Sequence, residues 1–388
     1  MTETVTPTPG TVTDVERWAR MGLACASEPA DRALTRLVTD EGAVAVWQSL
    51  SGARRDTVWG RRAVGVRLTR VQRATDQCGA RFIVPGDPEW ADQLGDLAEA
   101  ELTISEKTMG GAPLGLWLLG PGHLKLWAAD SVAVVGSRAA TSYGETVAAD
   151  LCAELAGRGR TVVSGGAYGI DAYAHRGAMA GGGQTICVLA NGVDVGYPRG
   201  NNRLFDALRS EQLICSELPP GDHPTRTRFL GRNRVIAALA AGTVMVEAGM
   251  RSGARNTLSW GEELSRRLMA VPGPITSALS ANPHKVIRDR TAELVTTAAE
   301  VCELVAPMGQ DLLPLQRGRS RVLDGLDEVQ RSVFEAVPGR GGLSAGELSA
   351  RCGLDLMSVL DALTELEDTG LVRRTDRGGW KLEPGSVG

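Results

Sequence analysis

Two glycine-bearing turns have the residue types of anion-binding loops. The first carries Gly136, Ser137 and Arg138, and the second, about thirty residues later, begins at Ser164 and Gly165. Each follows an apolar, β-branched run that predicts a buried strand, and each precedes a predicted helix. Backbone N–H groups at a helix N-terminus bind phosphate, and glycine lets the backbone approach it. We therefore expect two phosphate cradles with a bidentate contact from Arg138; the alternative is a plain turn that leaves Arg138 in solvent.

Two further side chains follow Gly165 in the second turn. Asp171 is expected to cap the following helix and to hold the turn through its carboxylate oxygens rather than to catalyse a reaction. Tyr168 is either a ring that stacks on a base or a side chain that packs along the sheet edge. Only the first alternative for Tyr168 adds to ligand binding.

The most basic part of the chain lies between Arg226 and Arg255, where six arginines accompany one acid, Glu247. An aromatic ring and an amide stand among the first arginines: Arg226, Arg228, Phe229, Arg232, Asn233 and Arg234. Guanidinium groups bind a nucleic-acid backbone and a ring stacks on a base, so this mixture indicates a single strand. On a helix that begins near Leu230 these arginines point in different directions, so we expect two or three of the four to contact the strand. The alternative is a solvated helix face.

A third loop carries Arg251, Ser252 and Gly253 directly after the predicted strand 243–247. In a parallel sheet the carboxyl ends of the strands share one edge, where open α/β folds bind ligands. We therefore place this loop beside the two glycine-bearing turns as a further binding segment.

Signatures of catalysis and of cofactor binding are scarce. The dinucleotide pattern G-x-G-x-x-G and the P-loop Gly-Lys-Ser/Thr are missing, which disfavours NAD and ATP. None of the four histidines belongs to a metal-type pair, so we predict no catalytic residue, no metal and no cofactor. His175 is expected to be a structural polar contact, and Glu247, at a strand end, is the best acid candidate if there is chemistry.

The elements that position these loops alternate between strands and helices from Ser131 to about Val305. Predicted strands cover residues 132–135, 161–164, 185–189, 213–217, 243–247 and 268–271. This alternation predicts βαβ units, a parallel sheet and an α/β fold class. The segment 80–127, which contains the apolar run 114–119, is expected to extend the sheet.

Length and composition limit the class of protein. A chain of 388 residues predicts two or three domains, and a hydrophobic content of 43% with a net charge of −4 is ordinary for a globular protein. The seven cysteines form no C-x-x-C pair, which favours thiols in a reducing cytosol. Since no apolar run is long enough to cross a membrane, we predict a cytoplasmic protein without membrane contact.

The C-terminal part has a different charge balance. From Arg321 onward, twelve acids face eight bases. Three helices and a hairpin predict a winged helix, with Ser344 opening the second helix in a capping box and Asp355 capping the third. The third helix carries only acidic charge, and the hairpin is basic. We therefore expect this part to bind protein, with at most the hairpin touching a nucleic acid.

Seven ordered motifs resemble the DprA/Smf family of bacterial DNA-processing proteins. They occupy residues 135–144, 163–178, 192–198, 216–221, 229–237, 246–257 and 271–274. The resemblance implies an extended Rossmann-like core that binds single-stranded DNA and is not an enzyme. It also implies a homodimer that protects incoming strands and loads the recombinase RecA during natural transformation. Relatives commonly have a positively charged residue where this chain has Tyr168. Stacking of the Tyr168 ring on a nucleobase would here replace the phosphate contact of that charge.

Together, pattern and resemblance predict five segments and one site. The segments are a disordered start (1–11), an N-terminal helical domain of SAM or helix–hairpin–helix type (12–75), the core (76–306), a linker (307–322) and the winged helix (323–388). The predicted DNA-binding residues are Gly136, Ser137, Arg138, Ser164, Gly165, Tyr168, Arg228, Phe229, Arg232, Asn233, Arg234, Arg251, Ser252 and Gly253. Two other classes stay open: a nucleotide hydrolase similar to phosphoribohydrolases, although their signature loop is missing, and a non-catalytic interaction scaffold.

Overall fold

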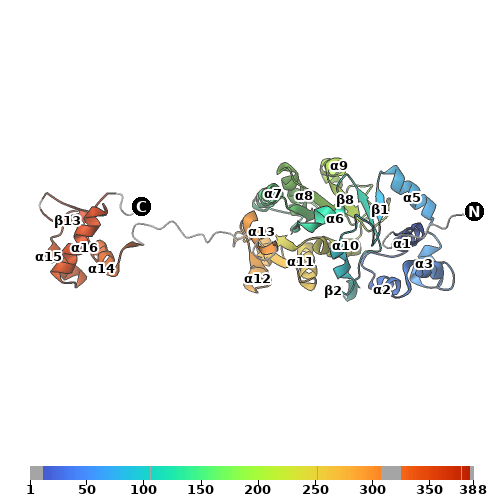
Figure 1. The fold of residues 1–388 in the computed structure, drawn as a ribbon, viewed down its shortest axis with the longest axis horizontal. Helices are drawn as coiled ribbons and strands as arrows, with labels where there is room; N and C mark the ends of the chain where they lie inside the picture. Colours follow the sequence, from blue (N-terminus) through green and yellow to red (C-terminus); the bar gives the residue numbers. More distant parts are fainter. Residues whose placement is uncertain (1–11, 105, 251, 307–324, 377, 385–388) are drawn as a thin grey trace, which may run out of the picture. The chain divides into compact units, whose positions relative to one another are not determined.

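The computed structural model describes residues 12–104, 106–250, 252–306, 325–376 and 378–384. The chain divides into two compact units, Met1–Leu313 and Pro314–Gly388 (Figure 1). The larger unit contains a nine-stranded sheet with helices on both faces, and the smaller contains three helices and a two-stranded ribbon. Arg251, one of the predicted site residues, lies outside the described residues, as do the predicted disordered start and the whole of the predicted linker.

Five helices precede the sheet. They are α1 (Asp14–Ala26), α2 (Arg32–Glu41), α3 (Ala43–Ser51), α4 (Val58–Ala63) and α5 (Leu68–Gln77). The side chains of Thr13 and Asp31 cap α1 and α2 by accepting a backbone N–H. Leu23 of α1 shares a hydrophobic core with Trp117 of the sheet. The helices expected as a separate domain therefore share their packing with the core.

The sheet has the strand order β1-β4-β8-β7-β6-β5-β9-β10-β11. Its strands are β1 (Arg81–Ile83), β4 (Leu116–Leu119), β5 (Ser131–Val135), β6 (Thr161–Ser164), β7 (Thr185–Val188), β8 (Leu213–Ser216), β9 (Gly242–Met245), β10 (Arg267–Ala270) and β11 (Glu293–Leu294). Strand β4 pairs antiparallel with both of its neighbours, β1 and β8, and all the other pairs are parallel. The six strands predicted from β-branched runs are confirmed to within two residues at each end, because buried parallel strands consist of nearly continuous apolar residues.

Helices cover both faces of the sheet (Figure 1). On one face lie α7 (Ser142–Gly157), α8 (Ile170–Ala180) and α9 (Asn202–Glu211), and on the other α10 (Arg226–Leu239) and α11 (Gly253–Glu263). Alternate residues of β5 follow this division: Val132 and Val134 belong to one hydrophobic cluster, Ala133 and Val135 to another. The strand order reverses between β5 and β9, which creates a topological switch point at their carboxyl ends.

Smaller elements complete the larger unit. They are the 3₁₀ turns η1 (Asp92–Leu97), η2 (Arg199–Asn201) and η3 (Ala278–Ser280), the helices α6 (Leu124–Ala129), α12 (Ala281–Arg288) and α13 (Ala298–Val305), and the antiparallel hairpin β2 (Glu101–Ile104) and β3 (Lys107–Gly110). The hairpin is separate from the large sheet and contacts both α10 and α11.

The smaller unit contains α14 (Glu328–Ala336), α15 (Ala345–Cys352) and α16 (Leu356–Asp368), followed by β12 (Val372–Arg374) and β13 (Trp380–Leu382). The predicted capping box of Ser344 and Glu347 is confirmed, as is the cap of α16 by Asp355. Side chains of Val333, Leu363 and Trp380 belong to its own hydrophobic core. The assignment of this unit as a winged helix stays a prediction.

Candidate nucleic-acid interface

An open groove with a volume of about 1240 Å³ lies at the switch point. It is bordered by the loops that follow β5 and β9, by α10 and α11, and by the β2–β3 hairpin. Eight of the predicted site residues line it: Gly136, Ser137, Arg138, Phe229, Arg232, Asn233, Ser252 and Gly253. Five others are not among its lining residues: Ser164, Gly165, Tyr168, Arg228 and Arg234.

The first glycine-bearing turn spans the switch point. The Ser137 N–H donates to the Glu247 carbonyl oxygen over 2.6 Å, and the Ser137 hydroxyl accepts from the Ala139 N–H over 3.2 Å. A Cβ at Gly136 would collide with Ile170 and with the Glu247 carbonyl, so only glycine fits there. The turn was expected to open a helix directly, but α7 begins at Ser142. The reason is that Thr141 provides the cap, and Arg138 is left exposed in the loop before it.

Arg138, Phe229 and Arg232 form the centre of the groove. The Arg138 guanidinium carbon lies 4.5 Å from the centroid of the Phe229 ring, and that of Arg232 lies 5.7 Å from it. Cations at these distances are attracted to the ring quadrupole. A second ring, Tyr197, lies 5.9 Å from Phe229 and is also exposed to the groove. Tyr197 is not among the residues predicted for the site, although it belongs to the motif 192–198.

The side chain of Arg232 is buried next to the Phe229 ring. One of its Nη atoms donates to the Gly165 carbonyl over 2.7 Å and to the Val188 carbonyl, so it links the ends of β6 and β7 to α10. A side chain at Gly165 would meet this guanidinium, which explains the glycine. Burial lowers the pKa of Arg232 below its usual value, opposed by the nearby Asp171 carboxylate, and burial raises the pKa of Asp171.

The second turn uses its polar groups internally. The Ser164 hydroxyl donates to the Val134 carbonyl over 2.7 Å, and the Ile170 N–H donates to the Ser137 carbonyl over 3.1 Å, so the two turns are bonded to each other. Asp171 was expected to cap α8; instead Gly169 is the N-cap residue, and Asp171 accepts the Ala167 N–H from within the first helical turn. These contacts favour a supporting role for the turn.

The Tyr168 side chain is not among the residues that line the groove, and 47% of the residue is exposed. Its hydroxyl accepts the Gly200 N–H over 3.3 Å. The ring thus lies along the loop of η2 while much of its surface stays in solvent. Both alternatives considered for Tyr168, packing at the edge and stacking on a base, are compatible with this position.

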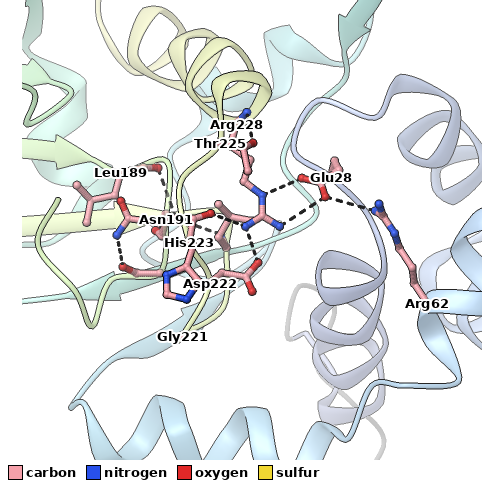
Figure 2. Close-up of polar contacts among 12 residues, drawn as sticks. Glu28, Arg62, Leu189, Asn191, Gly221, Asp222, His223, Thr225 and Arg228 are labelled. Carbon is pink, nitrogen blue, oxygen red and sulfur yellow. Dashed lines mark hydrogen bonds and ion pairs between the residues drawn. The ribbon is translucent and has the colours of Figure 1, made fainter. Parts of the chain in front are cut away.

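Arg228 belongs to an ion-pair network between α10 and the N-terminal helices (Figure 2). Its Nε donates to Glu28 over 2.8 Å, and its Nη1 lies 3.0 Å from Asp222. Glu28 also pairs with Arg62 over 3.5 Å. The helix was expected to begin near Leu230, but it begins at Arg226 because Thr225 accepts the Arg228 N–H and caps it. Arg228 is therefore in the first turn of α10, directed to Glu28.

Arg234 is 1% exposed and pairs with a carboxylate in the interior. Its Nη2 donates to Glu217 over 2.6 Å, and its Nε donates to the Gly111 carbonyl over 3.0 Å. This arrangement favours a structural role for Arg234 over the direct DNA contact predicted from the sequence.

The third loop meets α10 at the far wall of the groove. Ser252 is the N-cap residue of α11. Asn233 donates from Nδ2 to Asn256 of α11 over 3.0 Å. Arg255, which the sequence analysis left out of the site, lines the groove together with Arg226. The signal that could have indicated Arg255 is its position at the end of the basic segment 226–255.

The titratable groups near the groove have structural partners. Glu247, the acid candidate, is 1% exposed, and both its carboxylate oxygens accept from Thr141, one from the backbone N–H and one from the hydroxyl. His175 is buried with its Nδ1 2.7 Å from the Thr185 hydroxyl, and burial lowers its pKa to about 3. Among the residues that the structure describes, no group of His, Cys, Asp and Glu is arranged to hold a metal ion. In the same part of the chain, no helix has the length and apolarity that crossing a membrane requires.

Comparison with known proteins gives one consistent result. Residues 81–306 match the family described as DNA recombination-mediator protein A. A protein of Mycobacterium tuberculosis named as a DprA-type DNA processing protein is 46% identical over 304 residues, 78% of this chain and 77% of that protein. Protein Smf of Escherichia coli is 40% identical over 254 residues, 65% of this chain and 67% of that protein. The X-ray structure of DNA processing protein A (DprA) from Streptococcus pneumoniae aligns with a TM-score of 0.62 and 30% identity, covering 75% of this chain and 97% of that one.

Proposed function

Because this chain belongs to the DNA recombination-mediator protein A family, we propose that its groove binds single-stranded DNA without catalysing a reaction. The observation that carries this proposal is the half-buried Phe229 ring with the Arg138 guanidinium 4.5 Å from its centroid in an open groove. Arginine binds the phosphates and the ring stacks on a base, which are the two contacts that a single strand requires.

The charge of the groove supports this ligand. Among the residues that the structure describes, four arginines line it: Arg138, Arg226, Arg232 and Arg255. Among the described lining residues the only acid is Asp171, whose pKa burial raises. Apolar side chains line it as well: Leu102 and Ile104 of the hairpin and Leu230 of α10. A single strand offers phosphates to the arginines and unpaired bases to the apolar side chains, whereas a duplex keeps its bases stacked inside.

We extend the proposal to the biological role that the family resemblance implies. The chain acts as a homodimer that protects incoming strands during natural transformation and loads RecA onto them. These finer parts rest on the family alone. Acceleration of RecA filament formation on single-stranded DNA by the purified chain would test the loading role, and its absence would remove that part while leaving DNA binding intact.

A mobility shift on oligothymidine, without nucleotide or metal, tests the binding itself. We expect the full chain to shift the oligonucleotide, and Arg138→Ala to bind about tenfold more weakly with a salt slope shallower by about 0.7, the contribution of one single-strand phosphate contact. Arg158→Ala is the matched control, since Arg158 is an exposed arginine at the end of α7, away from the carboxyl edge. Equal binding by Arg138→Ala and the parent chain would contradict the proposed groove.

The hydrolase alternative depends on Glu247. Both its carboxylate oxygens accept hydrogen bonds from Thr141, so the side chain holds the N-terminus of α7 to the end of β9. Because Glu247 is also only 1% exposed, this arrangement favours a structural role for the carboxylate over contact with a substrate. Release of a free base from a nucleoside monophosphate, abolished in Glu247→Gln, is the result that would restore this alternative.

A further inference from the structure

A second hollow lies on the N-terminal helices, next to the β2–β3 hairpin. It has a volume of about 570 Å³ and is lined by the α1–α2 connection, by α2 and α4, and by β3. We call it the helical hollow. Four cations line it: Arg32, Arg36, Arg62 and Lys107. None of these residues belongs to the family motifs or to the groove at the switch point.

The two acids of the helical hollow, Glu28 and Asp31, are already held by donors of the protein. Glu28 pairs with Arg228 of α10 over 2.8 Å and with Arg62 over 3.5 Å (Figure 2). Asp31 accepts the Leu34 N–H over 3.2 Å as the cap of α2, and its other oxygen accepts the Trp59 indole N–H over 2.7 Å. Each carboxylate is therefore held by protein donors, and neither is directed at Arg36 or Lys107.

Arg36 and Lys107 are the available cations. Both are exposed, and within the described parts of the chain neither has an ion pair or a side-chain hydrogen bond. Arg32, by comparison, pairs with Glu101. The half-buried indole of Trp59 and the exposed Val58 add apolar surface to the same hollow. The helical hollow thus combines unpaired cations with an aromatic ring, as the groove combines the exposed Arg138 with Phe229.

The hairpin joins the helical hollow to the groove. Thr103 of β2 lines the groove, and its cross-strand partner Thr108 of β3 lines the helical hollow. Their hydroxyls are 3.1 Å apart. Paired strands are about 5 Å apart, so a chain that leaves the groove over this hairpin reaches the helical hollow within a short distance.

We propose that the helical hollow is a second binding site, which holds the phosphates of nucleotides that flank the segment bound in the groove. The proposal rests on the proposed function of the groove. Arg36 and Lys107 contact the backbone of the strand as it crosses the hairpin, and the Trp59 ring offers a face to a base without sequence preference. The N-terminal helices thus lengthen the DNA site in addition to packing on the sheet.

Oligonucleotide length separates the two sites. Oligothymidines of about 6 and about 20 nucleotides, one near the lower end of the range of single-strand site sizes and one beyond its upper end, are titrated with the full chain and with Arg36→Ala/Lys107→Ala. We expect unchanged affinity for the short strand. For the long strand we expect affinity reduced by about fivefold to tenfold, with a salt slope shallower by about 1.4, the contribution of two phosphate contacts.

The control variant removes two positive charges as well, but near the amino ends of the parallel strands, away from the groove at their carboxyl ends. Arg158→Ala/Arg267→Ala deletes two exposed arginines, one at the end of α7 and one at the amino end of β10, and should bind both strands as the parent chain does. The proposed second site would be overturned if Arg36→Ala/Lys107→Ala bound the long strand with the same affinity and the same salt slope as the parent chain. Failure of the parent chain to bind either strand would instead overturn the proposed function of the groove.

Discussion

The arginines around the groove divide into two groups that differ in their partners. The rim arginines, Arg138, Arg226 and Arg255, line the groove with part of their side chains in solvent. The buried arginines, Arg232 and Arg234, bond to carbonyl oxygens and to Glu217 in the interior. Residue type is the same in both groups, and α10 contributes to each. The difference shows that an arginine next to the groove can hold the groove together instead of facing into it.

The physical reason is the cost of burying a charge. A buried guanidinium is stable only where its donors have acceptors, so Arg232 and Arg234 belong to the folded structure before any ligand arrives. The rim arginines keep most of their hydration and can exchange it for phosphate oxygens. Substitutions in the buried group should therefore change stability first, and those in the rim should change binding first.

The largest expected effect tests the buried group. Arg234→Ala leaves the Glu217 carboxylate without its partner, and breaking such a pair lowers the free energy of unfolding by about 3–5 kcal/mol. Urea denaturation followed by circular dichroism measures it. Replacement of both partners, Arg234→Met with Glu217→Leu, should recover most of the loss because no charge stays buried. A stable Arg234→Ala protein with weakened DNA binding would reverse the assignment of Arg234.

A smaller effect is expected at the ring between the two groups. Phe229→Ala should weaken binding of oligothymidine by about 1–3 kcal/mol, the contribution of one stacked base. Fluorescence anisotropy with a labelled oligonucleotide measures the affinity. Phe229→Tyr keeps the aromatic face and should bind like the parent chain. Equal losses in both variants would mean that packing around Arg138 and Arg232, rather than stacking, is the role of the ring.

A third effect is a pH dependence of the free energy of unfolding, which comes from a buried group that does not line the groove. His175 is buried, and its pKa is about 3 in the folded protein against an ordinary value of 6.5. Below about pH 6.5 the unfolded chain binds a proton that the folded chain does not, so stability falls by about 1.4 kcal/mol between about pH 7.5 and about pH 5.5. Urea denaturation at the two pH values measures the change. In His175→Gln this part of the pH dependence should vanish; an unchanged pH dependence in that variant would exclude His175 as its source.

The smallest effect is expected from the C-terminal unit. The exposed face of α16 carries Asp361, Glu365, Glu367 and Asp368, which repel phosphates, whereas the ribbon carries Arg373 and Arg374. Deletion of residues 321–388 should therefore change the affinity for single strands by less than about tenfold, or about 1.4 kcal/mol. Titration of a long oligothymidine compares the two proteins. A larger loss would place a main DNA contact in this unit.

Much of the fold followed from the sequence because its signals are local. The β-branched runs gave the six core strands, and capping residues such as Ser344 and Asp355 gave helix starts in the C-terminal unit. The start of α10 was misplaced because Thr225 was not recognised as its cap. The glycines at 136 and 165 indicated a close approach, but the groups that approach them are the Ile170 side chain and the Arg232 guanidinium of the protein itself.

The sequence by itself determined the α/β class, the edge of the sheet that carries the candidate site, and the concentration of positive charge there. Only the tertiary structure decided which polar groups line the groove at that edge. The partners of Arg228 and Arg234 are Glu28 and Glu217, and Phe229 meets Tyr197 of a separate loop. Whether a guanidinium is free depends on such distant residues, because burial and pairing are properties of the packed chain and leave no mark on the local pattern.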